Sequence, residues 1–284
     1  MKKIMAIFAL SLVVACSSEN PESEVAGEDE DNQYESAEAE DIDKNDQDKT
    51  EDPVDSEERE DEGELSEESE EVEVTHYIAE DYTVRPLEED GDEQVVLLTI
   101  DDAPEDHGVE MAETLKELDA GAIFFVNGHF LQSDEGKDQL TEIYELGFEI
   151  GNHTMNHPNL NDLSEEEQYN EIVELNDLVE EIIGERPNFF RAPFGANTDY
   201  SNQVLEDEGM VAMNWSYGYD FEPEYMEADP LADIMVETDL LRNGANLLMH
   251  DRSFTSEALE DIVIGLREKG YEPLDPARIE TNYN

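Results

Sequence analysis

The sequence predicts a parallel α/β fold from residue 95 onward, and three observations lead to this prediction. Short apolar runs recur along this part of the chain, each run is apolar throughout instead of alternating with polar residues, and longer helical patterns separate the runs. Continuously apolar runs are typical of strands that are buried on both faces. Strands that alternate with helices form parallel sheets, and an open doubly wound sheet and a closed barrel both fit this order.

The predicted elements follow one another in a regular alternation. The seven strands are expected at residues 95–100, 122–126, 148–151, 188–191, 211–215, 245–249 and 270–274, with about six helices between them. The clearest helix begins at a capping box of Ser164 and Glu167. Its apolar positions recur at helical spacing, at Ile172, Leu175, Val179 and Ile182. The last helix shows the same spacing at Leu259, Ile262, Val263 and Leu266.

The charge of the chain separates a long N-terminal segment from this α/β region. The whole chain of 284 residues has a formal net charge of −64. Residues 17–73 hold 28 acidic against three basic residues and almost no aromatic ones, so they cannot bury enough apolar surface to fold. We therefore predict a disordered acidic tether at 16–73, a lead-in segment at 74–94 and a folded domain at 95–284. So acidic a chain is not expected to bind nucleic acid.

The first residues of the chain have the pattern of an export signal. Lys2 and Lys3 precede an apolar run at 4–15, and Cys16, the single cysteine, follows directly. This run is too short for a transmembrane helix, which needs about 20 apolar residues. The residues before Cys16 resemble a bacterial lipobox, so we expect a lipoprotein signal peptide at 1–15, a lipid anchor on Cys16 and an extracytoplasmic protein held at the membrane. The alternative is an ordinary signal peptide with an incidental cysteine.

Polar residues that can carry chemistry follow the predicted strands. Parallel strands place their C-terminal ends on one face, where α/β barrels and open sheets hold their active sites. The residues expected to meet on this face are Asp101, Asp102, His153, His157, Arg191, Asp220 and His250.

Two of these histidines have a spacing that suits a metal. His153 and His157 are four positions apart, so a helical turn or tight loop could bring both imidazoles to one ion. With one carboxylate they would form a site that keeps open positions for water and substrate. Each residue alone also has an ordinary structural explanation: histidines are common surface residues, Arg191 could cap a helix, and His250 could be a hydrogen-bonded core residue.

Six motifs taken together are more informative than any one residue. In chain order they are TIDDAP (99–104), FFVNG (124–128), EIGNHTMNHPNL (149–160), FFRAPFG (189–195), WSYGYDF (215–221) and LLMHD (247–251). This set resembles the polysaccharide deacetylase family, carbohydrate esterase family 4, over residues 95–276. The resemblance implies that residues 95–284 form a distorted (β/α) barrel of seven to eight parallel strands with a divalent metal, usually Zn²⁺, and Co²⁺, Mn²⁺ or Ni²⁺ as alternatives.

The resemblance also implies a role for each motif residue. The implied metal ligands are Asp102, His153 and His157. The implied catalytic residues are Asp101 as general base, Arg191 as the partner that orients it, His250 as general acid and Asp220 as the carboxylate that holds this histidine. The implied substrate contacts are the backbone N–H of Phe194, as oxyanion donor, and an acetyl pocket of Trp215, Phe221 and Leu248.

Some positions depart from the family pattern or have no role in it. The family usually has Phe at Ile100, Gly at Ala103 and Trp at Phe221, and these changes leave the expected ligands intact. His76 and His107 belong to no motif, and we predict that both are surface residues.

The resulting expectation is a monomeric metal-dependent hydrolase. It would remove N-acetyl groups from an N-acetylhexosamine polymer, and a wall-facing location points to peptidoglycan N-acetylglucosamine. The alternatives are an O-acetyl esterase acting on xylan or a similar glycan, and a catalytically silent wall-binding protein on the same fold. Iron(II) and oxygen chemistry on the same ligand set is a further alternative, against which the α/β pattern argues.

Overall fold

The computed structural model describes residues 72–281. The predicted signal peptide at 1–15, Cys16 and nearly all of the predicted tether at 16–73 therefore lie outside the described residues. None of the helices within residues 72–281 has the length and apolar character that crossing a bilayer would require.

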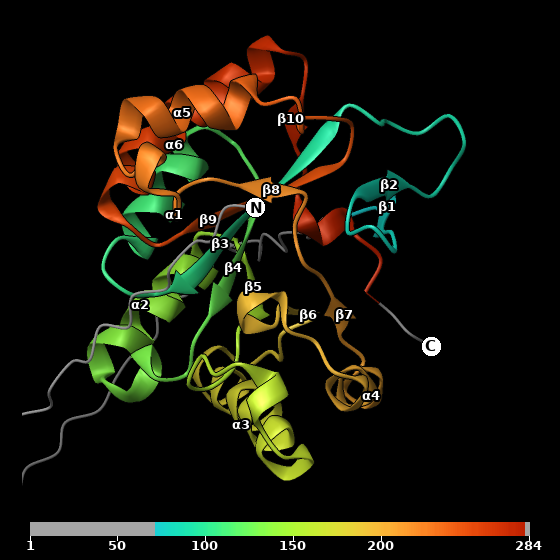
Figure 1. Ribbon diagram of the computed structural model, residues 1–284, viewed down its shortest axis with the longest axis vertical. Coiled ribbons are helices and arrows are strands. Elements are labelled where there is room, and N and C mark those ends of the chain that lie inside the picture. Colours follow the sequence, from blue (N-terminus) through green and yellow to red (C-terminus); the bar gives the residue numbers. More distant parts are fainter. Residues whose placement is uncertain (1–71, 282–284) are drawn as a thin grey trace, which may run out of the picture. The chain divides into compact units, whose positions relative to one another are not determined.

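Ten strands and six α-helices make up the described region (Figure 1). The strands are β1 (His76–Ile78), β2 (Val84–Pro86), β3 (Val95–Ala103), β4 (Ala122–Val126), β5 (Glu149–Asn152), β6 (Phe189–Phe190), β7 (Val211–Ala212), β8 (Tyr217–Gly218), β9 (Ala245–His250) and β10 (Glu272–Pro273). The helices are α1 (Gly108–Glu117), α2 (Asp134–Glu145), α3 (Glu165–Ile183), α4 (Asp199–Glu208), α5 (Ala228–Glu237) and α6 (Ser253–Glu268). Short 3₁₀ helices are η1 (Phe130–Gln132), η2 (Leu160–Asp162), η3 (Pro193–Gly195), η4 (Pro223–Tyr225) and η5 (Pro276–Arg278).

Eight of the strands form one parallel sheet, which curls into an incomplete barrel. The strand order is β7-β6-β5-β4-β3-β9-β8, and β10 pairs with the first residues of β3. No pairing joins β7 to β8 in the described part of the chain, so the barrel stays open between these two strands. The predicted parallel barrel and all seven predicted strands are confirmed, whereas β8 and the hairpin β1–β2 were not predicted. These strands have only two or three residues each and lie outside the continuous apolar runs from which the other strands were predicted.

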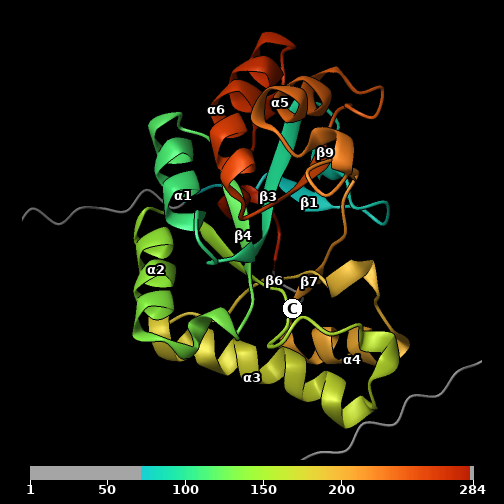
Figure 2. The same ribbon diagram turned by 60° about the vertical axis from the view of Figure 1, so that its left-hand side comes forward.

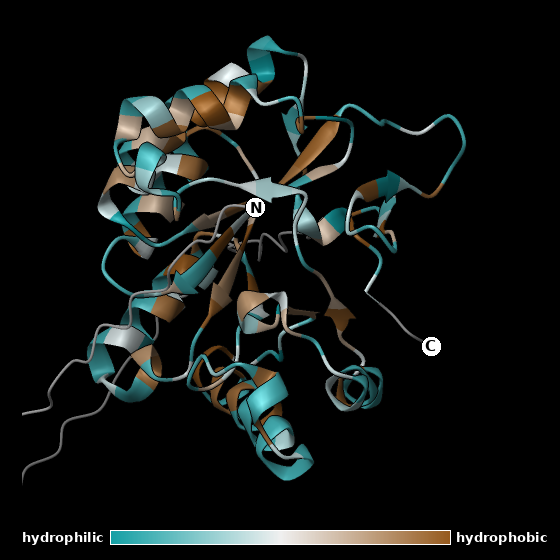
Figure 3. Cartoon of the chain, viewed as in Figure 1, coloured by the Kyte–Doolittle hydropathy of each residue, from teal (hydrophilic) through white to brown (hydrophobic). Residues whose placement is uncertain are grey.

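The outer face of the sheet packs against the helices. Alternate residues of β3, among them Val96, Leu98 and Ile100, join the apolar core formed with α1, α2, α3, α5 and α6. Figure 1 shows these helices on the outside of the central strands, and Figure 3 shows brown, apolar residues along much of the central strands and teal, hydrophilic residues at the end of β3 and on the outer surface of α3. The helices therefore cover one face of the central strands, and since the other face is buried inside the barrel, most residues of these strands are apolar.

The inner face of the sheet forms a second core inside the barrel. Val95 and Leu97 of β3 pack there with Phe125 and other inward residues. The antiparallel hairpin β1–β2 contributes Val84 to this core, and Figure 2 shows it beside the N-terminal end of β3. The hairpin of the predicted lead-in segment at 74–94 is thus packed against the barrel, whereas residues 87–94 are mostly exposed.

This hairpin corrects one of the sequence predictions. His76, which we expected at the surface, is only 2% exposed. Its Nε2 lies 2.9 Å from the Asp92 carbonyl oxygen, and it pairs with Ile279 near the C-terminus. The hairpin was not predicted, so the burial of His76 could not be. His107 lies partly exposed at the start of α1, as expected, with its Nδ1 3.2 Å from Glu110.

Helix α3 has the predicted ends and the predicted buried face. The capping box of Ser164 and Glu167 is present, and Gly184 ends the helix in a left-handed conformation with φ 82°, which glycine adopts without steric cost. Ile172 packs with α4, β6 and β7 in a third apolar cluster. Ile172 also accepts the side-chain amide of Asn152, the last residue of β5, so α3 lies next to the C-terminal end of β5, where two of the motif histidines follow.

Candidate active site

The alternation of side chains along β3 and β9 carries two motif residues into the barrel. Val95 and Leu97 face the inner core, so Thr99 and Asp101 face the same way. Asp101 and His250 are register partners on the adjacent parallel strands β3 and β9. The carboxylate and the imidazole therefore lie side by side at the C-terminal end of the barrel.

Asp102 reaches the same site because the end of β3 is irregular. In a regular strand, consecutive side chains point to opposite faces. The pairing of β3 with β4 shifts register between Ile100 and Ala103, and Asp102 has a left-handed backbone with φ 62°. Both aspartates consequently approach the motif histidines, although they are neighbours in sequence.

Three side chains converge as a metal site would require. The Oδ1 atom of Asp102 lies 3.8 Å from Nε2 of His153 and 3.5 Å from Nε2 of His157. The three ligand atoms all lie within 4.8 Å of one another. Ligands of a tetrahedral Zn²⁺ ion are about 3.4 Å apart when the metal–ligand bonds have their usual lengths. The donor set and its spacing therefore fit a divalent metal.

The environment of His153 prepares this imidazole to bind a metal. Its Nδ1–H donates to the Arg191 carbonyl oxygen at 2.7 Å, which leaves the lone pair of Nε2 facing Asp102 and His157. Burial lowers the pKa of His153 below its ordinary value, against the opposing charges of Asp101 and Asp102. A neutral ring with a fixed tautomer is the form that ligates metals.

The loop between the two histidines is held by buried polar groups. The amide of Asn127, at the end of β4, donates to the carbonyl oxygens of His153 and Thr154. The hydroxyl of Thr154 accepts a hydrogen bond from the His157 N–H at 3.1 Å. Thr154 and His157 both have positive φ angles, 72° and 56°. Non-glycine residues rarely adopt this backbone conformation, so the hydrogen bonds must stabilise the loop in it.

Asp101 is buried and paired with a single arginine. Its Oδ1 accepts a hydrogen bond from Nη1 of Arg191 at 2.6 Å, and its Oδ2 lies 3.6 Å from Nε2 of His153. Burial would raise the pKa of Asp101, but the pKa lies below its ordinary value, chiefly because of the charge of Arg191. Asp101 is therefore ionised at neutral pH, with one oxygen hydrogen-bonded to Arg191 and the other near His153, one of the candidate metal ligands.

Arg191 is completely buried, and its partners include residues that sequence reasoning missed. Nη1 also donates to the Thr99 hydroxyl at 2.8 Å, and Nη2 donates to the Asn214 carbonyl and to Oδ1 of Asn246. The ring of Phe125 covers the guanidinium at 4.4 Å. Thr99 and Asn246 are polar residues inside predicted apolar strands, and this signal could have identified them.

His250 is held by a carboxylate, as the motif implied. Its Nδ1–H donates to Oδ1 of Asp220 at 2.7 Å, and its backbone N–H donates to Oδ2. Asp220 is fully buried and also accepts from the Thr255 hydroxyl, while Arg252 donates to its backbone carbonyl. Burial lowers the pKa of His250, but the hydrogen bond and charge of Asp220 outweigh burial, and the resulting pKa lies above the ordinary value.

The four predicted substrate contacts lie around these groups. The Phe194 ring is 66% exposed and its centroid is 5.0 Å from that of His157. Phe221 packs edge-on against His250 at 6.0 Å, and Trp215 lies 6.0 Å from the Arg191 guanidinium. Leu248 is buried on β9, two residues before His250.

The backbone turn that carries Phe194 leaves its amide without a hydrogen-bond partner among the described residues. Phe194 has a left-handed backbone with φ 60°. Gly195 and Ala196 donate their N–H groups to Ala192 and Pro193, whereas no hydrogen bond from the Phe194 N–H was found within residues 72–281. The Phe194 amide is thus available as a donor.

Sequence reasoning also missed Asp251, which directly follows His250. The Asp251 carboxylate accepts hydrogen bonds from the backbone N–H groups of Glu105 and His107, both at 2.7 Å. Its own N–H donates to the Asp101 carbonyl. Asp251 therefore fastens the loop that follows Asp102 to strand β9. An acidic residue next to a motif histidine was visible in the sequence, but acids are too common in this chain for the signal to stand out.

Comparison with known proteins identifies the family of this chain. A family profile described as polysaccharide deacetylase matches residues 88–213. A peptidoglycan-N-acetylglucosamine deacetylase of Bacillus cereus is 32% identical over 189 residues, which span 63% of this chain and 68% of the relative. The peptidoglycan-N-acetylmuramic acid deacetylase PdaC of Bacillus subtilis is 30% identical over 201 residues, which span 69% of this chain but only 41% of PdaC.

Solved structures show the same fold. The structure of PdaC matches with a TM-score of 0.57 and 28% identity, over 64% of this chain and 87% of that structure. A CE4 family pseudoenzyme from Bacillus anthracis matches with a TM-score of 0.58 and 29% identity, over 64% of this chain and 63% of that structure. These similarities, together with the predicted motifs and the observed barrel, show that the chain belongs to the polysaccharide deacetylase family.

Proposed function

We propose that this protein is a metal-dependent hydrolase that removes N-acetyl groups from an N-acetylhexosamine polymer, with peptidoglycan N-acetylglucosamine as its substrate. One observation carries the proposal. A cluster of three side chains that could hold a metal lies beside Asp101, whose pKa is held low, and the neighbouring strand carries His250, which is hydrogen-bonded to the Asp220 carboxylate. This combination offers the base and the acid that amide hydrolysis needs.

The metal would be held by Asp102, His153 and His157, whose donor atoms fit Zn²⁺. When bound, such an ion acidifies water and polarises a carbonyl oxygen. A metal held by these three ligands alone would keep coordination positions for water and the acetyl group.

Asp101 would act as the general base. Its pKa is held low, so the carboxylate is ready to accept the proton of the attacking water. Arg191 fixes one carboxylate oxygen by a 2.6 Å hydrogen bond, which leaves the other oxygen for the water. The oxygen of that water forms the new bond to the acetyl carbon.

His250 would act as the general acid, and Phe194 would stabilise the oxyanion. Asp220 binds Nδ1 of His250 and raises its pKa, so that Nε2 can deliver a proton to the leaving nitrogen as the carbon–nitrogen bond breaks. The free Phe194 N–H would donate to the oxygen of the tetrahedral intermediate. The products would be acetate and the free amine of the sugar.

Trp215, Phe221 and Leu248 would surround the acetyl methyl group. Each lies next to a group already assigned, since Trp215 is near Arg191, Phe221 contacts His250 and Leu248 precedes it on β9. An apolar pocket of this kind is how enzymes recognise a small alkyl group.

The proposed substrate, peptidoglycan, agrees with the proposed location outside the cell. The similar B. cereus and B. subtilis proteins are deacetylases of peptidoglycan, the cell-wall polymer. A lipid anchor at Cys16 and an acidic tether would hold this domain outside the cell within reach of such a polymer. We propose that it acts there as a monomer.

The test is mass spectrometry of three substrates incubated with the full-length protein and Zn²⁺. Peptidoglycan fragments should lose the mass of one acetyl group, replaced by hydrogen, on each N-acetylglucosamine. Chitooligosaccharides test the amide reaction without peptide, and acetylated xylan tests the ester reaction. Exclusive action on xylan would replace our proposal with an O-acetyl esterase.

The chain is also similar to a pseudoenzyme, so the absence of activity on all three substrates would be a meaningful result. If no substrate loses acetyl groups while Zn²⁺ still binds, the chain is a silent wall-binding protein and the hydrolase proposal fails. In that case Asp101→Asn would leave its biological effect intact.

A further inference from the structure

The conformation of the loop that carries His157 is not maintained by the metal ligands themselves. Residues 153–157 include two left-handed backbone positions, Thr154 and His157, and strand β5 has already ended at Asn152. The Thr154 hydroxyl binds the His157 N–H from within the loop. From outside the loop, the Asn127 amide and the backbone N–H groups of Gly128 and His129 hold residues 153–155. None of these bonds reaches Asn156, which directly precedes His157, so an interaction at this end of the loop is also needed.

Helix α3 supplies that interaction through one residue, Glu171. Its backbone carbonyl accepts the N–H of Met155 at 2.9 Å. One carboxylate oxygen, Oε2, accepts the backbone N–H of Asn156 at 2.7 Å, and the other, Oε1, accepts the Asn156 side-chain amide at 2.8 Å. Both oxygens of Glu171 are thus bonded to the residue that directly precedes His157.

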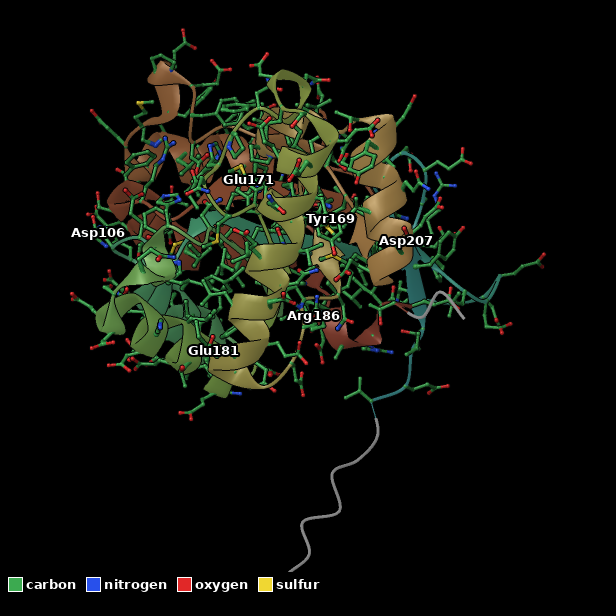
Figure 4. The ribbon with its side chains drawn as sticks, turned by 90° about the horizontal axis from the view of Figure 1, so that it is seen from below. Asp106, Tyr169, Glu171, Glu181, Arg186 and Asp207 are labelled. Atoms are coloured by element: carbon green, nitrogen blue, oxygen red, sulfur yellow. The ribbon has the colours of Figure 1, made fainter. Side chains whose placement is uncertain are left out.

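Glu171 is well supported in this position. The next residue, Ile172, accepts the amide of Asn152 through its carbonyl oxygen at 2.8 Å, so this turn of α3 is fastened to the end of β5 as well. Figure 4 shows Glu171 on α3, on the same helix as Tyr169 and Glu181. The helix therefore holds the loop at both of its ends, at Asn152 and at Asn156.

We propose that Glu171 is a positioning residue for the metal site: its carboxylate holds Asn156, and through it His157, at the place where the imidazole meets Asp102. This inference rests on the metal site of the proposed function. A charged acceptor forms stronger hydrogen bonds than a neutral one, and Glu171 uses both oxygens on one residue. Groups that orient metal ligands commonly change affinity by about 10–100-fold when they are removed.

The test measures metal binding, without substrate. The Zn²⁺ dissociation constant of the full-length protein is determined by competition with a chromogenic chelator, for the wild type, Glu171→Ala, Glu171→Gln and Asn156→Ala. We expect Glu171→Ala to weaken Zn²⁺ binding by about tenfold. Glu171→Gln, which keeps one acceptor oxygen, should recover part of this loss. The absorption spectrum of bound Co²⁺ should also change in Glu171→Ala, because it reports ligand geometry.

The matched control is Glu174→Ala, which removes an exposed carboxylate one turn along the same helix. This variant should bind Zn²⁺ like the wild type, and far-UV circular dichroism should show that all variants keep their helices. A Zn²⁺ affinity that is unchanged in Glu171→Ala, or lowered equally in Glu174→Ala, would overturn the inference. If Glu171→Ala does not fold, Glu171→Gln decides, and unaltered Zn²⁺ affinity and Co²⁺ spectrum in it would reject the positioning role. Tight Zn²⁺ binding without deacetylation would refute the proposed function and leave this inference standing.

Discussion

Asp101 and Asp102 are adjacent in the sequence, yet their environments are different. Asp101 is 2% exposed and bonded to Arg191, whereas Asp102 is part of the candidate metal site and is only half-buried. The two environments differ because the left-handed backbone of Asp102 turns its carboxylate toward His157. Substitutions at the two positions should therefore have separable effects.

Asp101→Asn should remove catalysis and keep metal binding. The amide cannot accept the proton of the attacking water, so we expect kcat to fall by about 10²–10⁴. Zn²⁺ affinity should stay near the wild-type value, because Asp101 is outside the ligand set. Acetate release and chelator competition measure the two properties. Asp106→Asn, at an exposed position in the next loop, is the control, and wild-type turnover by Asp101→Asn would show that another group is the base.

The raised pKa of His250 predicts how activity depends on pH. A general acid must be protonated before it donates, so kcat should fall as pH rises through the pKa of His250. Because Asp220 raises that pKa above the ordinary histidine value of 6.5, the alkaline limb should lie above pH 6.5. Asp220→Asn removes the charge and should move the limb to lower pH. Initial rates across the pH range test this shift.

The control for the pH profile is Glu222→Gln, which removes an exposed carboxylate two residues from Asp220. This variant should keep the alkaline limb of the wild type. A limb that moved upward in Asp220→Asn, or moved equally in the control, would contradict the role of His250 as the acid.

Connections between elements fix the site as firmly as the residues in it. Asp251 joins strand β9 to the loop between β3 and α1, because its buried carboxylate accepts two backbone N–H groups of that loop. A carboxylate near the start of a helix also interacts favourably with the helix dipole. The strand that carries the proposed acid therefore supports the loop that follows the proposed base.

Asp251→Ala should destabilise the fold measurably. The N–H groups of Glu105 and His107 would lose their acceptor, and we expect the free energy of unfolding to fall by roughly 3 kcal/mol. Urea denaturation measures this change. Asp275→Ala is the comparison, since Asp275 accepts one N–H at the start of an exposed 3₁₀ helix and should contribute less. Equal losses in the two variants would show that Asp251 has no special structural role.

At the scale of the whole molecule, negative charge dominates the electrostatics. Residues 74–284 contain 51 acidic and ten basic residues. Like charges at this density repel one another and destabilise the compact state. Salt screens this repulsion, since the Debye length shortens from about 10 Å at 0.1 M to about 3 Å at 1 M.

The melting temperature should therefore rise with NaCl concentration. We expect the steepest rise at low salt and a plateau once the charges are screened, measured by differential scanning calorimetry of the metal-free protein. Sucrose at matched osmolality serves as the control, because it stabilises proteins without screening charge. A melting temperature independent of NaCl would show that repulsion contributes little to stability.

The sequence by itself determined the α/β class, the seven strands and the residues that meet at their ends. Periodic burial is a local property, so apolar runs predict strands such as β3 and the capping box predicts the start of α3. The motif order then assigned Asp101 and His250 to one face, because parallel strands end together.

Only the tertiary structure decided the geometry in which these residues meet. Arg191 and Asp101 are 90 positions apart and His250 and Asp220 are 30 apart, so no local pattern predicts their contacts; the family resemblance implied both pairs, and the structure shows the hydrogen bonds that join them. The direction of Asp102 depends on a register shift between β3 and β4, which arises when two strands pair and is absent from either strand alone. The physical reason is the same in each case: spacing along the chain sets which face a side chain occupies, whereas its partner is set by packing between distant segments.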